Sequence, residues 1–202
     1  MNSKNYIQAF SHIKNNTVSL NGNPIYNLPE QNFSVFIKAA YKHLETKYSK
    51  FFKMDNLSKL AFLAADILLK DSKSEEDDIA IILSNRASSL DTDRKHQSSI
   101  SNAEQYYPSP AVFVYTLPNI CIGEISIKHG LFSENSFFIF DRFNADYLLD
   151  YAENLLQTNK AKKVLCGWVD FDEENYEAFL YLVDKQGDTI HTKEEITRLY
   201  TL

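Results

Sequence analysis

The chain has 202 residues, a 44% hydrophobic fraction and a formal charge of -6. This apolar fraction is ordinary for a globular protein and too high for disorder, and the length supports one well-buried core, so we expect a single domain over residues 1–202. The acidic balance excludes a phosphate-binding surface, which needs clustered basic side chains, and we expect no nucleic-acid partner.

The compartment follows from the N-terminus and the cysteines. MNSKNYIQAF lacks the long apolar core of a signal peptide. The flattest apolar stretch, residues 111–123, is too short to cross a bilayer and contains Pro118. Cys121 and Cys166 lie in apolar runs, where a buried free thiol is far commoner than a disulfide or a metal ligand. We therefore expect a cytoplasmic protein with no membrane partner.

The first third of the chain predicts a strand, a hairpin and a helix. Residues 6–13 alternate loosely enough for a strand, and an Asn-Gly pair predicts a tight turn within a hairpin over residues 18–26. Apolar residues then recur at helical spacing over residues 33–44. We interpret residues 13–50 as an insertion after the first strand.

The next segment predicts a helix followed by a buried strand. SKLAFLAADILLK (58–70) is strongly helical, with Ser58 placed to cap the first turn. The charged run over residues 70–78 predicts a solvated loop. DIAIILS (78–84) is nearly continuously apolar, which is typical of a strand buried on both faces in a parallel sheet.

A long polar segment comes next. Residues 85–110 are serine-rich and predict one helix over residues 91–100. Loops of this length are often functional, although a surface excursion capped by Ser and Asp side chains is the commoner structure. Pro118 suits the first turn of a helix, so we predict that residues 117–128 are helical.

The last third alternates strands and helices. The predicted elements are a strand at FFIF (137–140), a helix over 144–157, strands over 162–169 and 177–184, and a short last helix with a capping box of Thr192 and Glu195. We interpret the acidic group over residues 170–175 as a solvated loop, because no histidine and no EF-hand pattern accompanies it. This alternation predicts a mostly parallel sheet covered by helices.

Motifs for cofactors are missing from the sequence. It contains no Gly-x-Gly-x-x-Gly, Walker or Gly-x-Ser-x-Gly pattern. The histidines show no ligand spacing; they are His12, His43, His96, His129 and His191. We expect no cofactor and no metal.

Three stretches carry a family resemblance: residues 47–69, 82–93 and 108–130. Their most specific features are the pattern Pro118, Asn119, Gly123 and the spacing to Cys166-Gly167. Together they resemble the N-terminal half of β-ketoacyl-acyl-carrier-protein synthases, over about residues 47 to 170. The resemblance implies an α/β, thiolase-like half-domain with a five-stranded, mixed, mostly parallel sheet and helices on both faces.

The resemblance also implies where a nucleophile would stand. In that family a Cys lies at the corner between the third strand and the next helix, where the helix dipole lowers the thiol pKa. The equivalent position falls within Asp141, Arg142 and Phe143, none of which is a Cys. The two catalytic histidines of the family come from its C-terminal half. None of the five histidines of this chain matches either of them.

Two functions stay open on this resemblance. The first is a non-catalytic ketosynthase-like protein in fatty-acid-like, polyene or polyketide synthesis. The alternative is an acyl-thioester enzyme with an altered active site, which would use the loop over residues 85–110 and the Asp141-Arg142 corner.

The helix after the corner distinguishes a half built to stand alone from a fragment. Asp146, Asp150, Glu153 and Gln157 recur at i, i+4, i+7 and i+11 and form a polar stripe. In full ketosynthases the matching helix lies between the two halves. Burying unpaired carboxylates there would cost several kcal/mol each, so we expect this helix to face water and the chain to be a stand-alone half.

The resemblance finally implies partners. The third strand of the family lies at the sheet edge and pairs antiparallel with its twofold mate, and here that strand comprises Ser136, Phe137, Phe138, Ile139 and Phe140. An open apolar edge is an aggregation hazard, so we expect it to be covered. We predict a homodimer or a heterodimer with a full-length ketosynthase, and an acyl carrier protein as a further partner.

Overall fold

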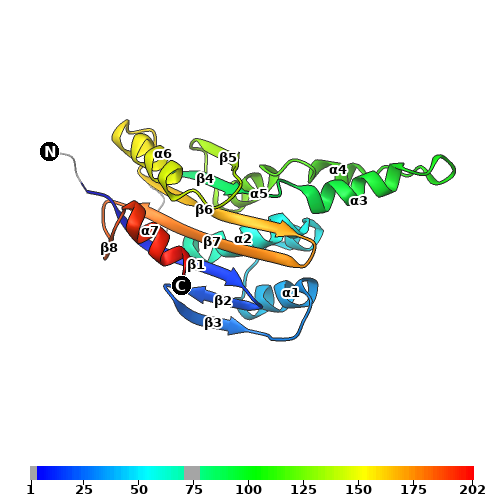
Figure 1. Cartoon of the computed structure of the whole chain (residues 1–202), viewed down its shortest axis with the longest axis horizontal. Helices are drawn as coiled ribbons and strands as arrows, with labels where there is room; N and C mark the ends of the chain where they lie inside the picture. Colours follow the sequence, from blue (N-terminus) through cyan, green and yellow to red (C-terminus); the bar gives the residue numbers. More distant parts are fainter. Residues whose placement is uncertain (1–3, 71–77) are drawn as a thin grey trace.

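The computed structural model describes residues 4–70 and 78–202, which form a central sheet with helices on both faces (Figure 1). The described strands are β1 (Tyr6–Lys14), β2 (Thr17–Leu20), β3 (Asn23–Asn27), β4 (Ile79–Asn85), β5 (Asn135–Ile139), β6 (Lys163–Asp172), β7 (Asn175–Asp184) and β8 (Thr189–Ile190). The α-helices are α1 (Phe33–His43), α2 (Asn56–Leu69), α3 (Leu90–Ile100), α4 (Pro110–Val114), α5 (Ile120–His129), α6 (Ala145–Gln157) and α7 (Lys193–Tyr200). Short 3-10 helices are η1 (Ser49–Lys53) and η2 (Ala103–Gln105).

The sheet differs from the five-stranded, mostly parallel sheet that we predicted. Its described strands number eight, in the order β3-β2-β1-β7-β6-β4-β5, with β8 also paired to β1. Strand β4 pairs parallel with β5 and β6, and the other described pairings are antiparallel. The hairpin and β8 extend the sheet beside β1. Because a tight turn links β6 to β7, these two strands run antiparallel.

The N-terminal hairpin forms as predicted. Asn21 and Gly22 have φ angles of 51° and 79°, in the left-handed region that a tight hairpin turn needs. The Asn21 side chain also accepts a hydrogen bond from the Phe10 amide, at 2.9 Å. The turn therefore fixes β2 against β1, next to α1.

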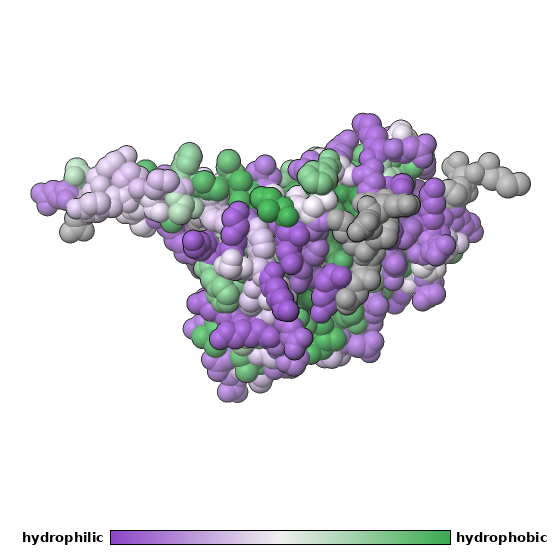
Figure 2. Space-filling view, turned by 180° about the vertical axis from the view of Figure 1, so that it is seen from behind, coloured by the Kyte–Doolittle hydropathy of each residue, from purple (hydrophilic) through white to green (hydrophobic). Residues whose placement is uncertain are grey.

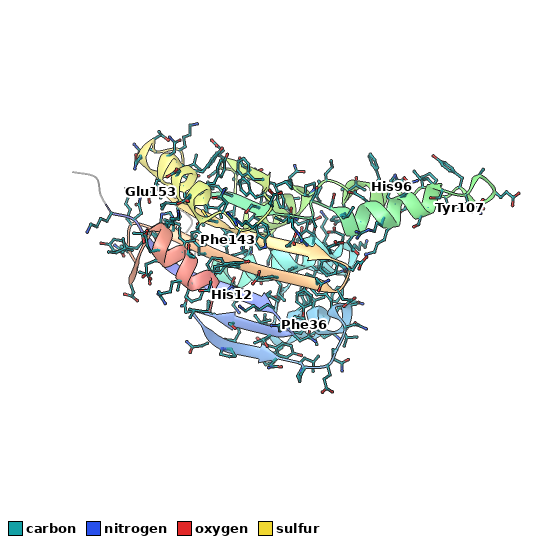
Figure 3. All side chains as sticks on the ribbon, viewed as in Figure 1. His12, Phe36, His96, Tyr107, Phe143 and Glu153 are labelled. Carbon is teal, nitrogen blue, oxygen red and sulfur yellow. The ribbon has the colours of Figure 1, made fainter. Side chains whose placement is uncertain are left out.

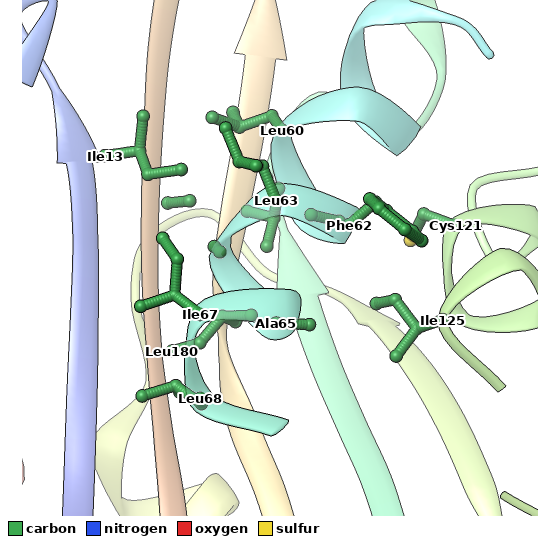
Figure 4. Close-up of a cluster of buried hydrophobic side chains, with 14 of the residues drawn as sticks. Ile13, Leu60, Phe62, Leu63, Ala65, Ile67, Leu68, Cys121, Ile125 and Leu180 are labelled. Atoms are coloured by element: carbon green, nitrogen blue, oxygen red, sulfur yellow. The ribbon is translucent and has the colours of Figure 1, made fainter. Parts of the chain in front are cut away.

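Helix α2 lies between the sheet and α5. Figure 4 shows Leu60, Leu63 and Ile67 on the side of the strands, whereas Phe62 points towards Cys121 and Ile125 of α5. Its cap is Asp55 rather than Ser58, because the Asp55 carboxylate accepts the Ser58 amide at 2.9 Å. Burial on both sides explains why its sequence is apolar almost all round.

Helices α6 and α7 cover the opposite face of the sheet. Leu148, Leu155 and Ile196 pack there with side chains from β4, β6 and β7. The cap of α7 is confirmed, because the Thr192 hydroxyl accepts the Glu195 amide at 3.3 Å. The Glu195 carboxylate, by contrast, pairs with Arg198.

The segment around Pro118 differs from the prediction of one helix over residues 117–128. Two helices, α4 and α5, form instead, and Pro118 lies between them. Ser109 caps α4 by accepting the Val112 amide, and Pro110 occupies its first turn. A proline does occupy the first turn of a helix here, but it is Pro110 in α4 and not Pro118.

Two predicted loops complete the comparison. Residues 170–175 are not a loop, because Asp170 to Asp172 end β6 and Asn175 begins β7, with Glu173 at a φ of 55° in the turn. The solvated loop over residues 70–78 lies largely outside the described residues. Among the residues that are described, no helix is long and apolar enough to cross a membrane, and no cluster of side chains could hold a metal.

Candidate functional site

The edge strand β5 leads to the corner that the sequence singled out. It runs from Asn135 to Ile139, so Phe140 of the predicted strand lies just beyond it, where its amide bonds to the Asn85 carbonyl at 2.9 Å. Phe137 packs on the α2 side of the sheet and Phe138 on the α6 side. In the described sheet β5 is the last strand on its side, paired with β4, and Ile139 is 49% exposed.

The corner itself is open to solvent. Asp141 and Arg142 are exposed, and Phe143 is half-buried. The Phe143 ring stacks on Tyr200 of α7, with 4.2 Å between the ring centroids. Asn144 then caps α6 by accepting the Tyr147 amide at 3.1 Å. The structure thus brings the three predicted site residues together at the start of α6.

The corner and α7 together line an open cleft of about 730 Å³. The sequence analysis missed the wall that α7 contributes, which consists of Lys193, Thr197, Tyr200 and Thr201. Lys193 pairs with Asp146 across the cleft at 2.5 Å. No local pattern links residues 47 positions apart, as Asp146 and Lys193 are, so only the fold could reveal this wall. Figure 3 shows Phe143 between α6 and α7.

The two thiols are both buried. Cys121 and Cys166 are free and fully inaccessible, and burial raises the pKa of each thiol far above its ordinary value. Since the thiolate is the reactive form, neither cysteine is placed to act as a nucleophile.

The polar stripe of α6 is exposed at three positions and partly covered at the fourth. Asp146, Asp150 and Gln157 are exposed, as predicted. Glu153 differs: its carboxylate accepts the Asn5 amide group and lies 2.8 Å from His191 Nδ1. Burial alone would raise the pKa of Glu153, but the bonds from His191 and Asn5 outweigh it and hold that pKa below its ordinary value. Glu153 therefore ties both ends of the chain to α6.

We expect Glu153→Ala to lower the free energy of unfolding by about 2 kcal/mol, because it leaves the buried His191 ring and Asn5 without their acceptor. Asp150→Ala, one turn earlier on the exposed face, should change it by less than about 0.5 kcal/mol. Urea unfolding of both variants checks this. Equal midpoints would show that the Glu153 contacts contribute nothing to stability.

An arm leaves the body on the same side as β5. Helices α3 and α4 contact each other and project beyond the sheet in Figure 1. More than half of the exposed large apolar side chains of the described chain lie within residues 106–139: Tyr106, Tyr107, Phe113, Val114, Leu117, Ile127, Phe132 and Ile139. Figure 2 shows hydrophobic side chains gathered where the arm meets the body. An apolar surface of this kind indicates an interaction site.

Comparison with known proteins identifies the fold. Neither a family model nor a curated protein sequence matches the chain. Solved structures do match, among them the ishigamide ketosynthase/chain length factor, with a TM-score of 0.65 and 17% identity over 90% of this chain and 62% of that one. A β-ketoacyl synthase from Burkholderia phymatum matches with a TM-score of 0.60 and 9% identity over 91% of this chain and 59% of that one.

A third match differs in extent. It is a ketosynthase (ApeO) in complex with its chain length factor (ApeC) from Xenorhabdus doucetiae, with a TM-score of 0.63 and 16% identity. There the alignment covers 98% of this chain and 90% of the matched chain, whereas this chain spans about three fifths of the other two. The chain therefore has the thiolase-like, mixed α/β fold of the ketosynthases and chain length factors.

Proposed function

We propose that this chain is a non-catalytic, ketosynthase-like partner that binds a full-length ketosynthase in fatty-acid-like, polyene or polyketide synthesis. The observation that carries the proposal is the match to one chain of a ketosynthase–chain length factor complex. The alignment covers 90% of that matched chain. An acyl carrier protein is the second partner that we propose, since a further matching structure has a carrier protein in complex with its ketosynthase.

The chemistry of the corner supports a non-catalytic role. By family resemblance the nucleophile would stand within residues 141–143, where this chain has Asp, Arg and Phe. A guanidinium has no free electron pair with which to attack a thioester, and a carboxylate exposed to water is a far weaker nucleophile than a thiolate. Phe143 is also occupied, because its ring stacks on Tyr200.

The edge of β5 supports a partner. Its outer backbone groups face away from β4, and Ile139, its last residue, is 49% exposed. Phe132, which precedes the strand, is 96% exposed. Exposed strand edges attract further strands, and natural proteins either cover them or place charges there. We propose that the ketosynthase covers this edge by antiparallel strand pairing, and that the exposed apolar side chains within residues 106–139 contribute to the same interface.

We expect Ile139→Lys to weaken binding to the ketosynthase at least tenfold, because it places an ammonium group in a desolvated strand pair. Ile190→Lys is the matched control, since Ile190 is a 42% exposed strand residue on the far side of the sheet, in β8. The measurement is light scattering and titration calorimetry of the chain with a purified ketosynthase from the same organism.

Wild-type protein and Ile190→Lys should form the same heterodimer. A homodimer of the chain that excludes the ketosynthase would support β5 as an interface strand but would contradict the ketosynthase as its partner. Unchanged affinity of Ile139→Lys would place the interface elsewhere.

A further inference from the structure

We infer that two carboxylates at the root of the arm, the half-buried Asp55 and the buried Glu124, fix the direction of the arm, so that it is a preset contact element. The arm comprises α3, η2 and α4, and its two legs enter the body beside α2 and α5. Asp55 holds the outgoing leg, which is the start of the arm at α3, and Glu124 holds the returning leg, which is the end of the arm just after α4. That the arm is preset follows from the contacts given below, whereas its use against a ketosynthase rests on the proposed function.

The outgoing leg is clamped by the cap of α2. One Asp55 oxygen accepts the Ser58 amide, and the other accepts the hydroxyl of Thr92 in α3 at 2.8 Å. Thr92 is the buried residue of α3. Asn56 adds a bond from its side-chain amide to the Asp91 carboxylate, at 3.1 Å. A single carboxylate therefore starts α2 and orients α3.

The returning leg is clamped by a buried glutamate of α5. Glu124 accepts the hydroxyl of Tyr48 at 2.7 Å and that of Tyr115, just after α4, at 3.1 Å. Lys50 lies 3.7 Å from the same carboxylate. Burial and the adjacent Glu124 raise the pKa of Tyr48 to about 12 and that of Tyr115 further, so both hydroxyls remain protonated donors.

The two legs are also tied to each other. The Ser89 hydroxyl, before α3, donates to the Thr116 carbonyl, after α4, at 2.5 Å. Beyond this junction the arm offers little apolar packing of its own, because Phe113 and Val114 of α4 are 58% and 46% exposed. Charge-assisted bonds at the root are stronger than neutral ones. If its end of the arm moved, each carboxylate would lose one hydrogen-bond donor, although Asp55 would keep Ser58 and Glu124 would keep Tyr48. The root contacts, together with the ion pair between Arg94 of α3 and Asp172 of β6, therefore set its direction.

Hydrogen–deuterium exchange of the full chain tests this. Tyr115→Phe removes the hydroxyl that Glu124 holds and keeps the ring, and Thr92→Val does the same for Asp55. Tyr107→Phe is the control, since Tyr107 is 79% exposed towards the end of the arm. We expect peptides over residues 109–119 to exchange at least tenfold faster in Tyr115→Phe, those over residues 86–100 to do so in Thr92→Val, and Tyr107→Phe to match the wild type.

Unchanged exchange in the arm, or an equal rise across β6 and β7, would overturn the inference. Because exchange is measured without a partner, this outcome is independent of the proposed function. Titration of the same variants with the ketosynthase then gives a second readout. Faster arm exchange with weakened binding supports a preset contact, whereas a wild-type chain that binds no ketosynthase would count against the proposed function alone.

Discussion

Replacing Gly167 with alanine is expected to lower the free energy of unfolding by about 3 kcal/mol. A Cβ atom at this position would lie 2.2 Å from the Phe179 carbonyl oxygen and 2.9 Å from the Leu180 Cα. Both atoms belong to the backbone of β7, which pairs with β6 in the middle of the sheet. Backbone cannot turn aside as a flexible side chain can, so the two strands would have to separate.

Gly123→Ala provides the matched control for that substitution. Gly123 lies within α5, and a Cβ there would meet nothing within 4 Å. Because glycine is a poor helix former, this variant should be more stable than the wild type, by up to about 1 kcal/mol. Urea unfolding followed by circular dichroism measures both. A Gly167→Ala protein as stable as the wild type would mean that β6 and β7 tolerate a wider spacing than the structure has.

Gly167 shows why one part of the family resemblance could be recognised in the sequence. Cys166-Gly167 was among the specific parts of the family resemblance, and the structure supplies the physical reason: a side chain would not fit between two central strands. Local signals were also sufficient for α6, for β4 and for the N-terminal hairpin, since each depends on spacing or turn chemistry within a few residues.

Long-range features were beyond those signals. The order of the strands depends on which strands pair across the whole chain. The extra strands and the mainly antiparallel pairing could therefore not be predicted from periodicity. The position of α7 beside the corner was missed for the same reason, although its capping residue Thr192 was correctly identified. Glu153 was misplaced because its partners, Asn5 and His191, lie far from it in sequence.

His12 gives the second large expected effect, a loss of stability in mild acid. Its side chain lies on β1 and is 4% exposed, with its ring centroid 4.8 Å from that of Phe179 and 6.4 Å from that of Tyr200. Burial, with a smaller contribution from the charge of Lys14, lowers the pKa of His12 to about 4. The imidazole is therefore neutral in the folded protein at pH values where an exposed histidine is charged.

The direction of the pH effect follows from the two states. As the pH falls below about 6.5, His12 takes up a proton in the unfolded chain but not in the folded one until about pH 4. The contribution of the neutral ring to stability is thus complete above pH 6.5 and is lost as the pH falls to 4. We expect this loss to reach roughly 2 kcal/mol, allowing for screening by solvent.

His12→Phe should remove this part of the pH dependence, because phenylalanine suits the surrounding rings and does not titrate. Thermal unfolding between pH 7 and 4 measures it, with His43→Gln, at an exposed position, as the control. Carboxylates titrate alike in all three proteins, so the comparison isolates His12. Parallel curves for wild type and His12→Phe would contradict the prediction. The Tyr200 ring lies next to the rings of both His12 and Phe143. As the pH falls, we therefore expect α7 and the corner to loosen at a higher pH than strand β5.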